Sequence, residues 1–126
     1  MVQRLVIEGT FITLNDLVKM AKRHWKSYAG WKKASTDSVG LLALLQGLKP
    51  VEGRVVLHFH WYEKDRRRDP DNLSAAGRKP TIDGLVKAGV LPNDGWKTIQ
   101  GLEDRFFVDK DRPRVEVEIE EVEGWR

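Results

Sequence analysis

Residues 54–63 read Arg-Val-Val-Leu-His-Phe-His-Trp-Tyr-Glu, with a large apolar side chain at every second position. A repeat of two is typical of a β-strand that buries one face. The apolar face would carry Val55, Leu57, Phe59 and Trp61. The other face would carry Val56, His58, His60 and Tyr62. The stretch therefore predicts a half-buried strand on which helices can pack.

The rest of the chain supplies further strands and helices. Strands are expected near residues 4–9, 99–108 and 114–122, and helices near 14–31, 37–48 and 80–88. The last two strands are separated by a polar turn at residues 109–113, which predicts that they pair antiparallel. Together the elements predict an α/β fold, in which residues 1–126 form a single small domain with a mixed β-sheet packed with helices.

Composition narrows the class of protein. The chain has 126 residues, a formal net charge of +3 and no cysteine, and its pI is near 9.3. The lack of cysteine excludes disulfides and thiolate metal ligands. The N-terminal segment is too charged for a signal peptide, and no stretch approaches membrane-spanning length. We expect a cytoplasmic protein without a membrane partner.

One helix carries a basic face. Every charged residue between positions 17 and 34 is basic: Lys19, Lys22, Arg23, Lys26, Lys32 and Lys33. Such a face can neutralise several phosphates of a nucleic acid, although a solvated helix surface gives the same pattern. The opposite face repeats in steps of four and three, which predicts core packing for Leu14, Val18, Ala21, Trp25 and Tyr28.

Two carboxylates follow a basic run. The segment Asp69-Pro70-Asp71-Asn72 comes directly after Lys64-Asp65-Arg66-Arg67-Arg68. We expect an extended backbone here, held open by the proline, so that Asp69 and Asp71 point the same way and share one divalent ion or a pair of ions. A plain surface turn is the alternative, since Asp, Pro and Asn are common turn formers.

A third carboxylate follows a short predicted helix. Pro80 suits a first helical turn, Gly77 is expected to break any earlier helix, and Gly89 is a natural residue after the helix end. Turns at each end would allow Asp94 to fold back toward Asp69 and Asp71. Three carboxylates could then converge on Mg²⁺, or on Mn²⁺, both of which prefer oxygen ligands.

Other side chains have simpler interpretations. His58 and His60 lack a third ligand at recognisable spacing, so a half-buried strand face is favoured over a metal site. Trp96 follows Asp94, and packing is favoured over stacking on a base. The leucine-rich helix at 37–48 is either fully buried or supports a subunit contact. Glu116, Glu118 and Glu120 alternate with apolar residues and would face away from DNA.

The stretch from Arg66 to Asp94 resembles the RusA family of Holliday-junction resolvases. It has the Arg-rich lead, the Asp-x-Asp-Asn, a lysine, an acid four residues later and a closing Asn-Asp. The likeness extends more loosely to Asn15 and to Arg23-His24-Trp25. It departs at residues 73–78, which separate the Asp-Asn from the lysine, and it lacks a proline-rich first loop.

The resemblance implies roles for individual residues. Metal-binding and catalytic acids would be Asp69, Asp71 and Asp94, and Lys79 would be the essential lysine, with Arg78 as the alternative. Secondary candidates are Asp83, the acid within the helix, and Asn72. We expect DNA contacts from Lys19, Lys22, Arg23, Lys26, Arg66, Arg67, Arg68 and Arg78.

The implied activity is Mg²⁺-dependent cleavage of four-way junction DNA by paired symmetric nicks, in DNA recombination and repair. Two symmetric nicks from a small subunit predict a homodimer. A non-catalytic nucleic-acid-binding module that uses the basic helix at 17–34 is the first alternative. An interaction protein that uses the leucine-rich helix is the second, and it predicts no salt-sensitive affinity for DNA.

Overall fold

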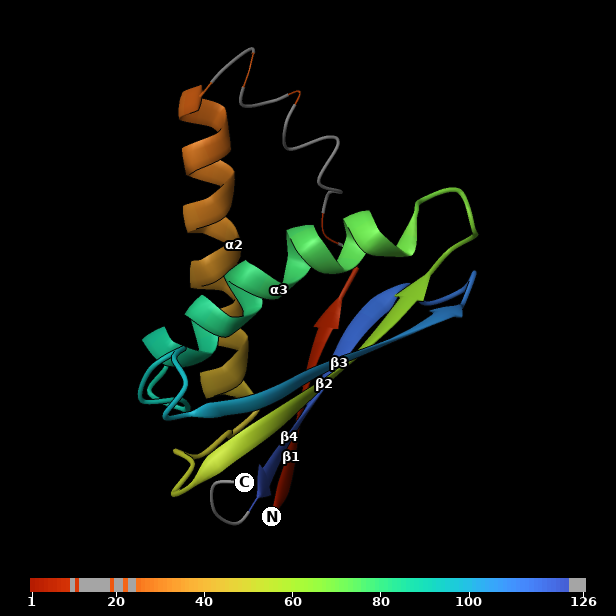
Figure 1. Ribbon diagram of the computed structural model, residues 1–126. Coiled ribbons are helices and arrows are strands. Elements are labelled where there is room, and N and C mark those ends of the chain that lie inside the picture. The colour runs from red at the N-terminus through yellow and green to blue at the C-terminus, as the bar shows by residue number, and fades with distance from the viewer. Residues whose placement is uncertain (10, 12–18, 20–21, 23–24, 123–126) are drawn as a thin grey trace.

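The computed structural model describes residues 1–9, 11, 19, 22 and 25–122. Within these residues, a four-stranded sheet and two helices form a small α/β domain (Figure 1). The α/β class and the mixed sheet predicted from the sequence are confirmed. In chain order the elements are β1 (Val2–Glu8), α2 (Trp25–Leu45), β2 (Arg54–Glu63), α3 (Pro70–Lys87), β3 (Ile99–Val108) and β4 (Arg114–Val122).

The strands lie in the order β1-β4-β2-β3. Strand β2 pairs parallel with β3 and antiparallel with β4, and β4 pairs antiparallel with β1. The predicted antiparallel pairing of β3 with β4 is therefore wrong, because β2 lies between them. Helix α3 connects β2 to β3, and strands joined through a crossover helix lie parallel. The polar turn instead carries the chain past the end of β2, where the Asp109 N–H donates to the Glu63 carbonyl oxygen at 2.7 Å.

Both helices cover the same face of the sheet (Figure 1). The predicted apolar face of β2 is the one they bury, and Phe59 and Trp61 on it are stacked with their ring centroids 5.5 Å apart. The alternating valines and isoleucine of β4 are buried beside them. Burial of this face is the main apolar contribution to stability, at roughly 25 cal/mol per Å² removed from water.

Helix α3 is longer than predicted. It begins at Pro70, so only Asp69, the N-cap residue, keeps the expected extended conformation, with φ −70° and ψ 134°. Gly77 lies inside the helix and does not break it. A Cβ at this position would come within 2.5 Å of Cζ3 of Trp61, so the bare glycine allows α3 to pass directly over the indole. Tertiary packing here overrides the local preference for a break.

The end of α3 follows the sequence prediction. Gly89 has φ +79°, the left-handed conformation that glycine adopts readily. Its N–H donates to the Val86 carbonyl oxygen at 3.0 Å, and the Val90 N–H donates to the Leu85 carbonyl oxygen at 3.0 Å. These two bonds form a Schellman motif, which stops the helix and turns the chain back toward β3.

Helix α2 continues where the sequence predicted a gap between two helices. The gap was expected near Asp37, but this side chain pairs with Lys33 at 3.3 Å and with Lys87 of α3 instead of capping a new helix. The two helices cross closely, since a Cβ on Gly84 would lie 2.5 Å from Cβ of Val39. Full burial of the leucine-rich segment is wrong, because three of its side chains are more than half exposed: Leu41, Leu44 and Leu45.

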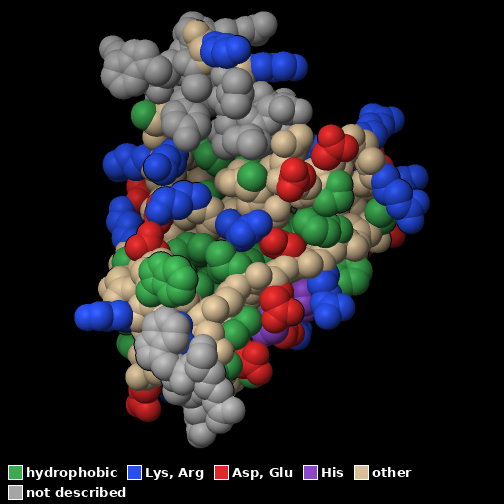
Figure 2. Space-filling model, in the orientation of Figure 1, with side chains coloured by type: hydrophobic (Ala, Val, Ile, Leu, Met, Phe, Trp, Pro, Cys, Tyr) green, Lys and Arg blue, Asp and Glu red, His purple; other side chains and the backbone are tan. Residues whose placement is uncertain are grey.

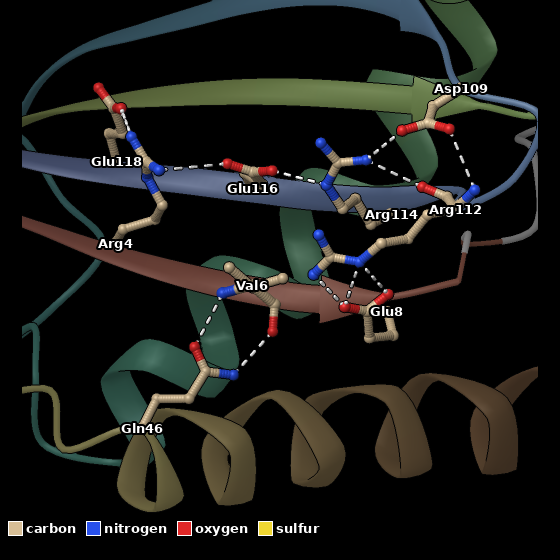
Figure 3. Close-up of polar contacts among 9 residues, drawn as sticks. All are labelled: Arg4, Val6, Glu8, Gln46, Asp109, Arg112, Arg114, Glu116 and Glu118. Carbon is tan, nitrogen blue, oxygen red and sulfur yellow. Dashed lines mark hydrogen bonds and ion pairs between the residues drawn. The ribbon is translucent and has the colours of Figure 1, made fainter.

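The second face of the sheet is covered by ion pairs and polar contacts. Figure 3 shows Arg4 beside Glu118 at 2.7 Å and Arg114 beside Glu116 at 2.6 Å. Nε2 of His58 lies 2.9 Å from a Glu120 oxygen. The predicted alternation of β4 is confirmed, with its glutamates on the face away from the helices; that they face away from DNA stays a prediction. The histidine therefore belongs to a polar strand face, and no described group of three or more His, Cys, Asp or Glu side chains is placed to hold a metal ion.

Candidate active site

The first two candidate acids lie at the N-terminus of α3. Asp69 is the N-cap, and its carbonyl oxygen accepts the N–H groups of Asn72 at 3.1 Å and Leu73 at 3.2 Å. Asp71 lies in the first turn, and both carboxylates are exposed. Negative charge at this end of a helix is favourable because the first N–H groups carry partial positive charge. These acids therefore help α3 to start, whatever else they do. Asn72 is half-buried beside them.

The third acid lies next to the candidate lysine. Nζ of Lys79 is 3.1 Å from Oδ2 of Asp94 and 3.1 Å from Oδ1 of Asp83. Hydrogen bonds to these two carboxylates raise the pKa of Lys79, and the lysine lowers the pKa of Asp94. The lysine is therefore fully charged at neutral pH. Three residues that the resemblance selects meet at one exposed point on the side of α3.

The loop that carries Asp94 is held in place by hydrogen bonds from residues of the loop itself and from β2. Oδ1 of Asn93 accepts the Gly95 N–H at 2.9 Å and the Thr98 hydroxyl at 2.9 Å. The Arg54 guanidinium donates to the Trp96 carbonyl oxygen at 3.0 Å. The asparagine of the Asn-Asp pair thus shapes the loop and leaves the aspartate side chain to contact Lys79.

Arg78 points elsewhere. Its guanidinium lies 3.1 Å from Oδ2 of Asp104 on β3, and Oδ1 of Asp104 accepts the Trp61 indole N–H at 2.8 Å. Of the two candidate cations, Lys79 is the one beside a predicted site acid. Asp104 was not among the predicted site residues. Its position opposite buried Phe59 follows from the parallel pairing of β3 with β2, which the sequence analysis did not predict, so no sequence signal pointed to it.

The three predicted metal ligands do not form a cluster in the described part of the chain. Asp71 precedes Lys79 by eight residues, which is about 12 Å along a helix axis. Asp94 contacts Lys79 at 3.1 Å, and so does Asp83, which lies one helical turn farther from Asp71 than the lysine does. In this arrangement the donor set does not fit a single divalent ion, which needs its oxygen ligands within about 2.1 Å of it. Convergence of the three carboxylates stays a prediction.

Basic side chains gather at two places on this side of the molecule. Figure 2 shows Lys and Arg over α2 and over the loop between β2 and α3. In the loop, Arg66 and Arg67 are exposed, whereas Arg68 donates to the Phe11 carbonyl oxygen at 2.7 Å. Burial raises the pKa of the neighbouring Glu63, and the Arg68 charge opposes that shift. The loop therefore has two exposed arginines, of which Arg67 lies 3.6 Å from an Asp65 oxygen, and a third, Arg68, that holds the fold together.

The predicted basic helix is described only in part. Lys19 and Lys22 have helical backbone and exposed side chains. Asn15, Arg23, His24 and most of the predicted apolar stripe lie outside the described residues, as do the side chains of Trp25 and Lys26. The described lysines are available to phosphate, and their placement relative to the α3 site stays a prediction.

Two grooves run along the edge between α3 and β3. One, of about 620 Å³, is lined by Lys79, Ile82, Asp94, Trp96 and Leu102, among others. The second, of about 560 Å³, is lined by residues of the Arg-rich loop and by Leu73, Phe106 and Val108. The Arg78–Asp104 ion pair separates the two grooves, because Arg78 on α3 and Asp104 on β3 each lie between residues that line the first groove and residues that line the second. The predicted packing of Trp96 is wrong, because its side chain is 80% exposed at the mouth of the first groove.

No protein-family model matches the chain, and no curated protein matches it significantly. Within the described residues, no helix has the length and apolar character needed to cross a bilayer.

Proposed function

We propose that this protein is a structure-selective DNA endonuclease that cuts four-way junctions. The observation that carries the proposal is the contact of Lys79 with both Asp94 and Asp83 at the edge of a groove. These residues are three of those that the RusA resemblance selects. They come from two separate parts of the chain, so their meeting is not a consequence of sequence spacing alone.

The chain's own groups can bind and orient a phosphodiester. Lys79 is more than half exposed, and its ammonium can turn from Asp94 to a phosphate oxygen that approaches along the groove. Positive charge at that point would stabilise the charge that develops on the phosphate in the transition state. Arg66 and Arg67 lie just before the N-terminus of α3 and would bind the phosphate backbone of the same substrate. Their contribution to affinity should weaken as the salt concentration rises.

Mg²⁺ or Mn²⁺ remains the cofactor that we propose from the resemblance, to be tested by metal titration. In the arrangement described above, the three acids do not fit one ion, so we assign no step to a metal. Lys79 and the arginines can act on the substrate in the geometry described.

A non-catalytic DNA-binding module is the second candidate, and one observation favours it. Each predicted catalytic acid already has a structural use: Asp69 and Asp71 at the start of α3, and Asp94 in the ion pair with Lys79. In that case the acids would shape the surface while exposed lysines and arginines bind phosphates.

One experiment distinguishes the endonuclease from the binding module: the protein is incubated with a fixed four-way junction and, separately, with a matched linear duplex. Reactions contain Mg²⁺, Mn²⁺ or neither, and the cut positions are mapped on denaturing gels. Paired nicks at symmetric positions of the junction, absent from the duplex, would support the endonuclease. Junction binding without nicks in either metal would favour the binding module. Asp111→Asn, in the exposed turn before β4, is the matched control for acid-to-amide changes and should behave like the parent.

A further inference from the structure

Strand β3 is an uncovered edge of the sheet. It is ten residues long, and among the described elements it pairs only with β2. Its outer side presents unpaired backbone N–H and C=O groups, which natural proteins usually protect. Large apolar side chains on it are two-fifths exposed or more: Leu102, Phe106, Phe107 and Val108. A long edge of this kind is suited to pairing with another strand.

The other edge of the sheet is protected. Figure 3 shows the side-chain amide of Gln46, beyond the end of α2, lying against the backbone of Val6 in β1. It accepts the Val6 N–H at 2.9 Å and donates to the Val6 carbonyl oxygen at 2.7 Å. Gln3 makes the same kind of reciprocal contact with the backbone of Lys49. Gln46 therefore satisfies the Val6 backbone groups of the β1 edge, and the Gln3 side chain holds the segment at Lys49 beside that edge. Strand β3 is the edge at which a further strand can be added.

The sequence of β3 complements itself. Glu103 and Arg105 pair with His58 and His60 of β2 and so lie on the sheet face away from the helices. Leu102, Asp104 and Phe106 lie on the helix-covered face. If two copies pair antiparallel about Asp104, Glu103 faces Arg105 of the partner subunit, and Leu102 faces Phe106 of the partner subunit. Opposite charges and apolar side chains directly across from each other stabilise an antiparallel pair.

Other registers lack this match. The two-fold axis that relates identical antiparallel strands is perpendicular to the sheet, so the helix-covered faces of both copies lie on the same side. The axis must pass beside one residue, which faces the same residue of the partner subunit, and a different register means a different central residue. A centre at Glu103 would put Leu102 opposite the partner's Asp104. A centre at Arg105 would put Asp104 opposite the partner's Phe106. With the centre at Asp104, the two Asp104 carboxylates meet, but each already contacts Arg78 and the Trp61 indole.

We propose that two copies of this chain associate through β3, antiparallel and centred on Asp104, to form one continuous eight-stranded sheet. Because the axis stands perpendicular to the sheet, the helices of both copies lie on the same face. Both Lys79–Asp94 sites then lie on that face. The exposed leucines of α2 lie away from this contact.

Charge exchange tests the contact without DNA. Sedimentation equilibrium of the parent at micromolar concentration should give twice the 14.5 kDa chain mass. Arg105→Glu puts like charges across both symmetric pairs and should weaken association about tenfold or more. Adding Glu103→Arg restores opposite charges and should recover the dimer. Leu44→Ser on α2 should leave it unchanged. A monomeric parent, a fully dimeric Arg105→Glu variant, or loss of the dimer in Leu44→Ser would overturn the proposal.

Cysteine pairs test the register, because the chain has no native cysteine. Leu102→Cys combined with Phe106→Cys should give a covalent dimer under mild oxidation. Either change alone should give no covalent dimer, because residues of the same number would be four positions apart, about 13 Å. A covalent dimer from a single variant would refute the register, and a double variant that stays monomeric would refute the contact.

Discussion

Replacing Gly77 by alanine should destabilise this protein, although the same change stabilises most helices. Alanine in a helix interior is favoured over glycine by about 1 kcal/mol. At this position, however, the new Cβ would lie 2.5 Å and 2.6 Å from two atoms of the Trp61 ring. That ring cannot move easily, because it stacks on Phe59 and its N–H is bonded to Asp104. Overpacking against a fixed ring costs about 3 kcal/mol, so the net loss should be about 2 kcal/mol.

Urea denaturation measures this loss as a lower midpoint at unchanged slope. Gly30→Ala in α2 is the matched control, because no described atom lies within 4 Å of its Cβ position. That variant should gain about 0.5–1 kcal/mol. A Trp61→Phe background removes the two contacted indole atoms and leaves Cδ2 of Phe11 2.9 Å from the new Cβ, so the cost of the Gly77 change should fall to about 1 kcal/mol. A Gly77→Ala protein as stable as the parent would be incompatible with the helix passing this close to the indole.

Three further predictions concern the proposed site. Because the resemblance makes Asp71 and Asp94 the metal-binding acids, Asp71→Asn and Asp94→Asn should each abolish junction cleavage. Affinity measured without metal should stay level or rise, because a charge that repels phosphate is removed. Normal nicking by either folded variant would refute its catalytic role. Reversing the charges of Lys22 and Lys26 should weaken junction binding and flatten its dependence on salt, and an unchanged slope would place both lysines away from DNA. The stability difference between the parent and Lys79→Met should stay constant through neutral pH and shrink only as pH falls below 3.8, the ordinary Asp value, since the lysine lowers the pKa of Asp94. At alkaline pH the same stability difference should shrink only above pH 10.5, the ordinary lysine value, since the pKa of Lys79 is raised. Urea midpoints across this pH range measure both limits. A stability difference that changes near neutral pH would contradict the pairing of Lys79 with Asp94.

The strands could be predicted because their alternation is local. The expected ranges 54–63, 99–108 and 114–122 agree with the observed β2, β3 and β4. Their neighbours could not be predicted from alternation, which says which face is buried but not which strand lies beside it. The long crossover through α3 decides that question, and its start was obscured by Gly77 and Pro80. Both residues oppose a helix locally and are accommodated only because the helix is buried on the sheet.

Part of the candidate site could likewise be predicted from the sequence, and part could not. The resemblance selected Lys79 and Asp94 together, and they are in contact. It also selected Arg78 as an alternative cation, which turns toward β3 instead. The partner of Arg78 is Asp104, and that pairing depends on the parallel neighbour of β2, which the sequence analysis did not predict. The resemblance thus selected residues along one helix and its following loop without predicting which of them touch, and contacts across the sheet were not predicted.

The ion pair between Lys79 and Asp94 has a consequence for how the protein responds to ionic strength. Both side chains are about half exposed, so dissolved salt screens their attraction. The Asn93 contacts fix the base of the loop, but the Asp94 side chain at its tip depends on the lysine charge. Added salt therefore loosens this tip in the free protein and, separately, would weaken the phosphate binding that we propose for the arginines. Cleavage lost at high salt should accordingly be compared with junction occupancy at the same salt, since the rate of the bound complex is expected to fall as well.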